Sequence, residues 1–275
     1  FAMTFGLMLS DHASRQLINP VFPFLKSEWA LSDSQLGSLA SVVALTIGLT
    51  TIPISLVADR VGWVRSATVM ALVWSLATMA CGMSTSFLAL LAARSLVGLG
   101  EAGYGGSGAA IIAQAFPRRL HSTAMGAYMA AAMIGSVLGV VAGGFVAQSL
   151  GWNAAFILAG AFGLVLAIVF GTVVVEPPSV RSIARARLPV RQVLANLLAT
   201  PTLLWLSLAG GFTLFVQASY VAWLPSYLNR YFGFDPAKAA AGTGALIVCS
   251  GVGMFLGGAL ADRLSQRVGL QVVVV

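Results

Sequence analysis

Four charged side chains lie inside long apolar stretches of this sequence, where an ionised group is costly. Asp11 and Arg15 are four residues apart, a spacing that brings an acid and a base together on one helix face. Arg94 and Glu101 are seven apart, two turns along one face. Because intramembrane charges usually mark ion or proton pathways, we predict a site of these four residues that exchanges protons or holds a charged solute.

A second interpretation stays open for Arg94 and Glu101, namely an ion pair that only fixes helix packing. His12, next to Asp11, is either a hydrogen-bonding residue or a proton carrier, and we assign it to a solute cavity. Gln217 and Tyr220 fall on one stripe of a later apolar stretch and are assigned to the same cavity, although aromatic residues near a helix end also form interface belts.

The composition requires a lipid environment. Of the 275 residues, 59% are hydrophobic and 8% are charged, whereas soluble domains carry about 25% charged residues. The net charge of +7 does not indicate nucleic acid, because the basic residues occupy short gaps between apolar stretches. We find no catalytic, metal-binding or nucleotide-binding motif, and we expect no enzyme activity, metal or cofactor.

The apolar stretches predict an all-α membrane protein, because each is long enough to span a bilayer as a helix. About eight spans are expected, near residues 2–25, 35–58, 66–84, 87–115, 122–148, 153–175, 202–228 and 238–261. A ninth would begin near Gly269. The apolar start and end of the chain suggest an internal piece of a twelve-helix protein.

The positive charges predict the orientation, because cytoplasmic gaps are rich in Lys and Arg. One set of alternating gaps holds Arg60, Arg65, Arg118, Arg119, Arg181, Arg185, Arg187, Arg191, Arg263 and Arg267. The opposite gaps hold Lys26, Arg230 and Lys238. The first helix should therefore start in the cytoplasm, and we expect a multi-pass, monomeric protein of the plasma (inner) membrane.

Three regions are expected along the chain: a six-helix bundle at 1–175, a basic cytoplasmic linker at 176–200, and the first helices of a second bundle at 201–275. Paired prolines, Pro177 and Pro178, end the sixth helix. Within the linker, the amphipathic stretch 190–198 fits either a helix on the membrane surface or a plain connection.

An internal repeat links the two bundles. Asp59-Arg60 after the second span recurs 203 residues later as Asp262-Arg263 after the eighth. Six helices separate the copies, so both face the same side, as in parallel repeats of transporters. We predict that these four residues and Arg65 form a conformational gate, with a static loop contact as the alternative.

These motifs resemble those of the major facilitator superfamily. The second copy, Gly258-x-Leu260-Ala261-Asp262-Arg263, is similar to its signature loop, whereas Ser55 and Trp63-Val64 depart from it in the first copy. Arg94-x-x-x-Gly98-x-Gly100 resembles a second superfamily pattern. The following Glu101-Ala102 resembles the Spinster-like branch.

Glycines at every fourth residue resemble the superfamily's helix-five motif, which is associated with the interface between the two halves. They are Gly135, Gly139 and Gly143, and Gly253 and Gly257 are a possible counterpart in helix eight. Such strips allow tight helix contact, and generic membrane packing is the alternative.

The resemblance implies two six-helix bundles in the lipid bilayer around a cavity with alternating access. We expect secondary active transport of a small organic or amphipathic solute, driven by protons that Glu101 and Asp11 exchange. Spinster-like relatives are associated with lysolipids, and neighbouring branches with organic anions or drugs. An uncoupled uniporter and a receptor-like protein without transport are the alternatives.

Overall fold

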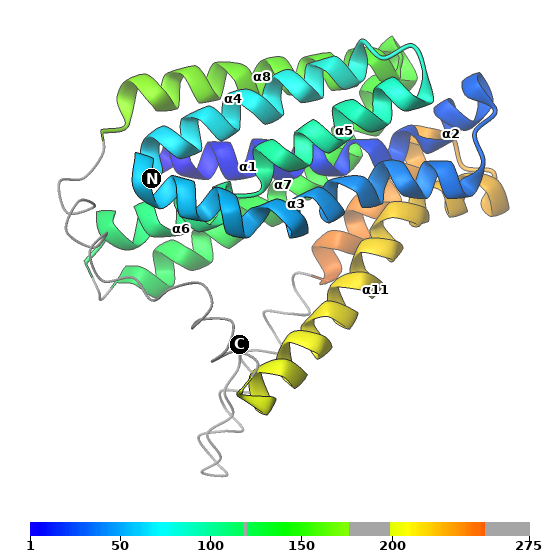
Figure 1. The fold of residues 1–275 in the computed structure, drawn as a ribbon. Coiled ribbons are helices and arrows are strands. Elements are labelled where there is room, and N and C mark those ends of the chain that lie inside the picture. Colours follow the sequence, from blue (N-terminus) through cyan, green and yellow to red (C-terminus); the bar gives the residue numbers. More distant parts are fainter. Residues whose placement is uncertain (118–119, 176–198, 251–275) are drawn as a thin grey trace.

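The computed structural model describes residues 1–117, 120–175 and 199–250, and these ranges form helices with short connections and no strand (Figure 1). The helices are α1 (Ala2–Gln16), α2 (Ile18–Trp29), α3 (Asp33–Val61), α4 (Trp63–Gly82), α5 (Phe87–Glu101), α6 (Tyr104–Ala115), α7 (His121–Leu150), α8 (Trp152–Val173) and α11 (Pro201–Phe232). A further helix begins at residue 236 and is described to residue 250. The chain is thus an all-α, multi-pass membrane protein.

Six helical segments of the described chain are long and apolar enough to cross a membrane, and they match six of the predicted spans. The expected span 2–25 is instead divided at Leu17 into α1 and α2. Pro20 explains the division, because a proline has no backbone N–H to donate to the carbonyl one turn earlier. The amphipathic stretch 190–198, Asp262, Arg263, Gly253 and Gly257 lie outside the described residues.

The span 87–115 is also interrupted, between Glu101 at the end of α5 and Tyr104 at the start of α6. Gly103 lies in the interruption and is closely packed, because a Cβ there would lie 2.6 Å from both the Ile54 and Met70 side chains. Both broken helices carry members of the predicted charge site close to the break.

Sharp reversals connect the outer helices of the bundle. Gly62 joins α3 to α4 with a φ of 112°, and Gly151 joins α7 to α8 with a φ of 90°. Residues with a Cβ rarely adopt such angles, so glycine allows neighbouring antiparallel helices to follow one another almost without a loop.

The glycine strip of α7 packs against α1. A Cβ on Gly135 would meet the backbone of Leu9, and one on Gly139 would meet the backbone of Ala13. The strip thus packs two helices of the first bundle together, as helix-packing glycines are expected to do. Other residues of α7 face the second half: Gly144 lies against Ala240, and Val141 lies against Gly244.

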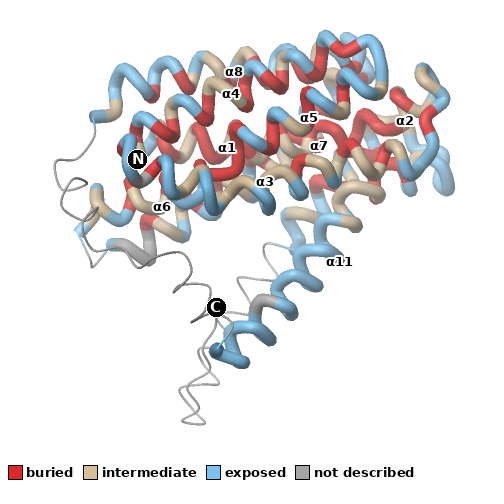
Figure 2. Tube along the Cα trace, in the orientation of Figure 1, coloured by how far each residue is buried: buried red, intermediate tan, exposed pale blue. Residues whose placement is uncertain are grey.

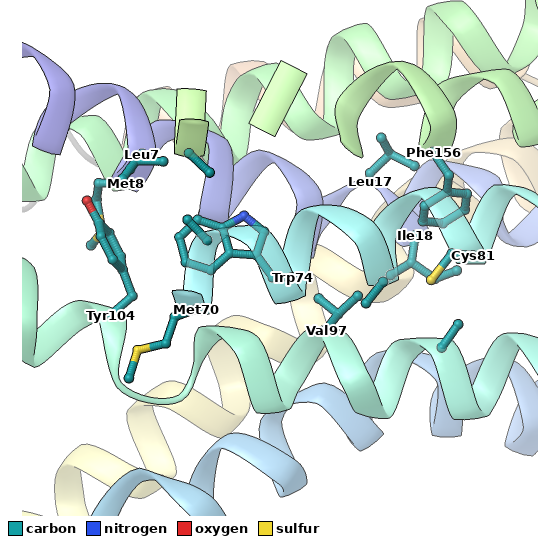
Figure 3. Close-up of a cluster of buried hydrophobic side chains, with 14 of the residues drawn as sticks. Leu7, Met8, Leu17, Ile18, Met70, Trp74, Cys81, Val97, Tyr104 and Phe156 are labelled. Atoms are coloured by element: carbon teal, nitrogen blue, oxygen red, sulfur yellow. The ribbon is translucent and has the colours of Figure 1, made fainter. Parts of the chain in front are cut away.

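The apolar core contains buried side chains from each of the helices α1 to α8, whereas the outer helix faces carry exposed Leu, Ile, Val and Phe (Figure 2). Trp74 is fully buried and makes an edge-on contact with the Tyr104 ring, 5.1 Å between centroids. Met70 and Val97 lie in the same cluster (Figure 3). Exposed apolar faces of this kind are what lipid tails cover in a multi-pass protein.

Among the described residues, the second half meets the first from the end where α2 lies to about the middle of α7. The last part of α11 packs against α2, while residues 201–218 of α11 are exposed wherever their side chains are described (Figure 1). We call the end where α2 lies the outer end, following the orientation predicted from the positive charges.

The close approach of α1 and α7 gives a test of packing. Replacing Gly139 with alanine should lower the stability of the folded protein by about 1–3 kcal/mol, because the new Cβ would overlap the Ala13 backbone. The melting temperature in detergent measures this. The matched control is Gly126→Ala on the same helix, where a Cβ meets nothing within 4 Å. Equal melting temperatures for the two variants would contradict the packing.

Candidate functional site

Arg15 is the centre of the charged cluster. Its Nε donates to Glu101 Oε2 at 2.9 Å, joining α1 to α5, and its Nη2 donates to Asp11 Oδ2 at 3.3 Å. His12 Nδ1 lies 3.0 Å from the same Asp11 oxygen. The predicted Asp11–Arg15 pair is therefore present, and the partner of Glu101 is Arg15 rather than Arg94.

One guanidinium thus serves two carboxylates. The second oxygen of each acid, Asp11 Oδ1 and Glu101 Oε1, is buried and accepts no hydrogen bond from any described residue. Leaving a buried acceptor unsatisfied costs roughly 1–3 kcal/mol, and more for a charged group. A proton added to either acid would remove a charge that Arg15 only partly balances.

The cluster is accessible from one side. The side chains of Arg15 and His12 are 32% and 22% exposed, whereas those of Asp11 and Glu101 are almost completely buried. A solute that reached the cluster would therefore meet a cation and an imidazole first, with the two acids behind them.

Arg94 contacts backbone carbonyls instead of the predicted partner Glu101. Its side chain is 1% exposed, and it donates to the carbonyl oxygens of Leu39, Ser14 and Arg15 at 3.2–3.4 Å. The break after Gln16 and the proline at position 20 leave carbonyls of α1 without their usual helical donors. Arg94 supplies those donors and fixes α1 and α3 against α5.

A tyrosine secures the break in the fourth span. Tyr104, the first residue of α6, is fully buried and donates from its hydroxyl to the carbonyl oxygen of Thr4 on α1 at 2.7 Å. This bond and the Arg15–Glu101 pair hold α1 on both sides of the α5–α6 break.

The structure does not bring every predicted residue into the cluster. Gln217 and Tyr220 lie on an exposed stretch of α11. Of the predicted gate, Arg60 at the end of α3 and Arg65 at the start of α4 are exposed and lie on either side of Gly62. The Asp59 side chain lies outside the described part.

Two features of the site were missed by sequence reasoning: the carbonyl ligands of Arg94 and the Tyr104–Thr4 bond. The helix break near Pro20 was visible in the sequence and could have suggested that free carbonyls need a donor. No signal in a single sequence pairs Tyr104 with a residue 100 positions away.

Comparison with known proteins supports a transporter. The family described as Major Facilitator Superfamily matches residues 4–275. A probable sulfoacetate transporter of Cupriavidus necator is 26% identical, with 94% of this chain and 63% of the relative covered. An MFS-type efflux pump of Mycolicibacterium smegmatis is 31% identical over 88% of this chain and 57% of its own length. The chain thus spans about 60% of these relatives.

Solved structures agree with these relatives. A bacterial homologue of the human lysosomal transporter Spinster, in an inward-facing and unoccupied conformation, superposes with a TM-score of 0.83 at 26% identity, covering 97% of this chain and 62% of its own. This supports the resemblance to the Spinster-like branch. A D-xylose–proton symporter shares the fold, with a TM-score of 0.67 at 15% identity over 95% of this chain and 68% of its own.

The carbonyl contacts of Arg94 predict a loss of stability on conservative replacement. Arg94→Lys should lower the free energy of unfolding by about 2 kcal/mol or more, because one ammonium cannot reach three carbonyls on two helices. Arg60→Lys, at an exposed position, is the control and should change it by less than about 0.5 kcal/mol. Equal unfolding curves for the two variants would argue that Arg94 has no structural role.

Proposed function

Because the chain belongs to the major facilitator superfamily, we propose that the protein is a secondary active transporter that couples solute movement to protons by alternating access. The observation that supports proton coupling is the sharing of Arg15 by two buried carboxylates. One extra proton on such a group would change how Arg15 is shared between the two acids.

Glu101 is the acid whose protonation would have the larger effect. It reaches Arg15 across 86 residues of sequence and so ties α1 to α5, whereas Asp11 reaches Arg15 within one helix. Protonation of Glu101 would weaken the charge-assisted bond between the two helices. Since both ends of that bond lie beside helix breaks, the weakened pair would favour rearrangement of α1 against α5 and shift the balance between inward and outward states.

We propose a small organic anion as the solute. The partly exposed side chains of Arg15 and His12 present donors and, on protonation of Glu101, part of the Arg15 fork becomes free for a carboxylate or sulfonate. The relatives include transporters named for sulfoacetate and D-galactonate. The lysolipids associated with the Spinster-like branch are the amphipathic alternative that the same cluster would have to accommodate.

Replacing Glu101 with glutamine tests the coupling. In proteoliposomes, Glu101→Gln should abolish uptake driven by a proton gradient, because the amide cannot exchange the proton, while solute exchange at equal concentrations continues. Asp235→Asn, at a partly exposed position far along the chain, is the control and should leave uptake unchanged. Gradient-driven uptake at the wild-type rate by Glu101→Gln would exclude Glu101 as the coupling site, and uptake that ignores a collapsed gradient in the wild type would favour uniport.

The solute class can be tested separately by thermal shift. Sulfoacetate and D-galactonate should raise the melting temperature of the wild type, and Arg15→Lys should weaken their binding at least about tenfold, because an ammonium cannot bind a carboxylate with a planar fork. D-Galactose, which lacks the carboxylate, is the matched ligand control. Stabilisation by a lysolipid and by neither anion would identify an amphipathic solute instead.

A further inference from the structure

An ion-pair cluster at the outer end joins the two halves of the chain. Arg230, in the last turn of α11, donates from Nη1 to Asp33 Oδ2 at 3.0 Å and from Nη2 to Asp33 Oδ1 at 2.7 Å. Lys26 of α2 donates to Asp33 Oδ1 at 2.7 Å. The acid and Arg230 are 197 residues apart, and none of these three residues belongs to the predicted gate.

The local sequence holds Asp33 in place for this contact. Ser32 caps α3: its hydroxyl accepts from Gln35 N, and Gln35 Oε1 accepts from Ser32 N at 2.9 Å. This reciprocal cap fixes the first turn, where Asp33 lies and where a negative charge also suits the positive end of the helix.

Arg230 lies at the C-terminal end of its helix, where the helix dipole favours a positive charge. Gly233 ends that helix with a φ of 66°. The cluster thus brings together the start of one helix and the end of another, each carrying the charge that its own end favours.

Apolar and polar contacts surround the cluster on the same end. Phe22 and Trp223 rings lie 5.5 Å apart, and the backbone N–H of Ala237 donates to Gln148 Oε1 at 2.9 Å. These contacts, like Asp33–Arg230, connect the first half to the second. Among the described residues, several contacts therefore join the two halves at the outer end, whereas residues 201–218 of α11 are exposed wherever their side chains are described.

We propose that the Asp33–Arg230 pair is a lock that holds the outer end shut and must open in each transport cycle. Lys26 belongs to the same half as Asp33, so it remains with the acid when Arg230 leaves. Opening therefore never leaves Asp33 without a cation. All three side chains are 33–51% exposed, so water and ions also replace the lost contact. This inference rests on the alternating-access part of the proposed function.

Distances between spin labels at the outer end would test the lock in the full-length protein. Labels at Met83→Cys and Tyr231→Cys, both strongly exposed positions, report the separation of the halves once Cys81 and Cys249 have been replaced with alanine. Asp33→Asn and Arg230→Gln should each raise the ratio of open to closed outer ends about three- to fivefold, the effect expected of an exposed pair. The double variant should equal either single variant, because both remove the same contact.

Asp235→Asn is the matched control, because the Asp235–Lys238 pair lies at the same end but within one half, at 3.3 Å. It should leave the distances unchanged. A salt concentration of about 1 M should raise the ratio of open to closed outer ends in the wild type, because ions screen exposed pairs. The same salt should not raise that ratio further in the Asp33 or Arg230 variants, which have already lost the pair.

Wild-type distances in the Asp33 and Arg230 variants, or additive effects in the double variant, would overturn the lock. Failure of proton coupling would look different: Glu101→Gln would retain gradient-driven uptake while Asp33→Asn and Arg230→Gln still opened the outer end. The two proposals can therefore fail independently.

Discussion

Charges buried in an apolar bundle must be satisfied by the protein itself, and this constraint organises the first half of the chain. The Arg15–Glu101 pair crosses from α1 to α5 and ends beside a break in each helix. The break at Leu17 leaves backbone carbonyls that need donors, which Arg94 provides, and Tyr104 beside the other break donates to the Thr4 carbonyl of α1. The helix breaks and the buried charges therefore depend on one another, and we expect a change in one charge to alter the packing of α1 against α5.

Glycines help to satisfy the buried charges, because they allow the backbones of neighbouring helices to come close together. Gly98 lies against Val43 of α3, one turn from the place where Arg94 reaches the Leu39 carbonyl on the same two helices. With a Cβ at Gly98, 2.7 Å from the Val43 oxygen, α5 would stand farther from α3 and the guanidinium would lose its acceptor. Gly98 thus keeps α5 close enough to α3 for Arg94 to reach its acceptor, in addition to its role in helix packing.

The two sets of ion pairs in this chain suit different tasks. The inner set is buried and partly unsatisfied, so its energy responds strongly to one proton. The outer set at Asp33 is exposed and shared between two cations, so it is weak and easily reformed. The alternating access that we propose would need both a sensitive interior site and contacts between the two halves that can be broken repeatedly.

The sequence by itself determined the helical membrane class, six of the described spans, the family and the Asp11–Arg15 pair, because these depend on composition and on spacings within one helix. Only the tertiary structure decided that Glu101 binds Arg15, that Arg94 binds carbonyls, and that the α7 glycines face α1. It also brought Asp33 to Arg230. Periodicity shows which side of a helix is polar, but the choice of partner is made by packing between residues about 50 to 200 positions apart.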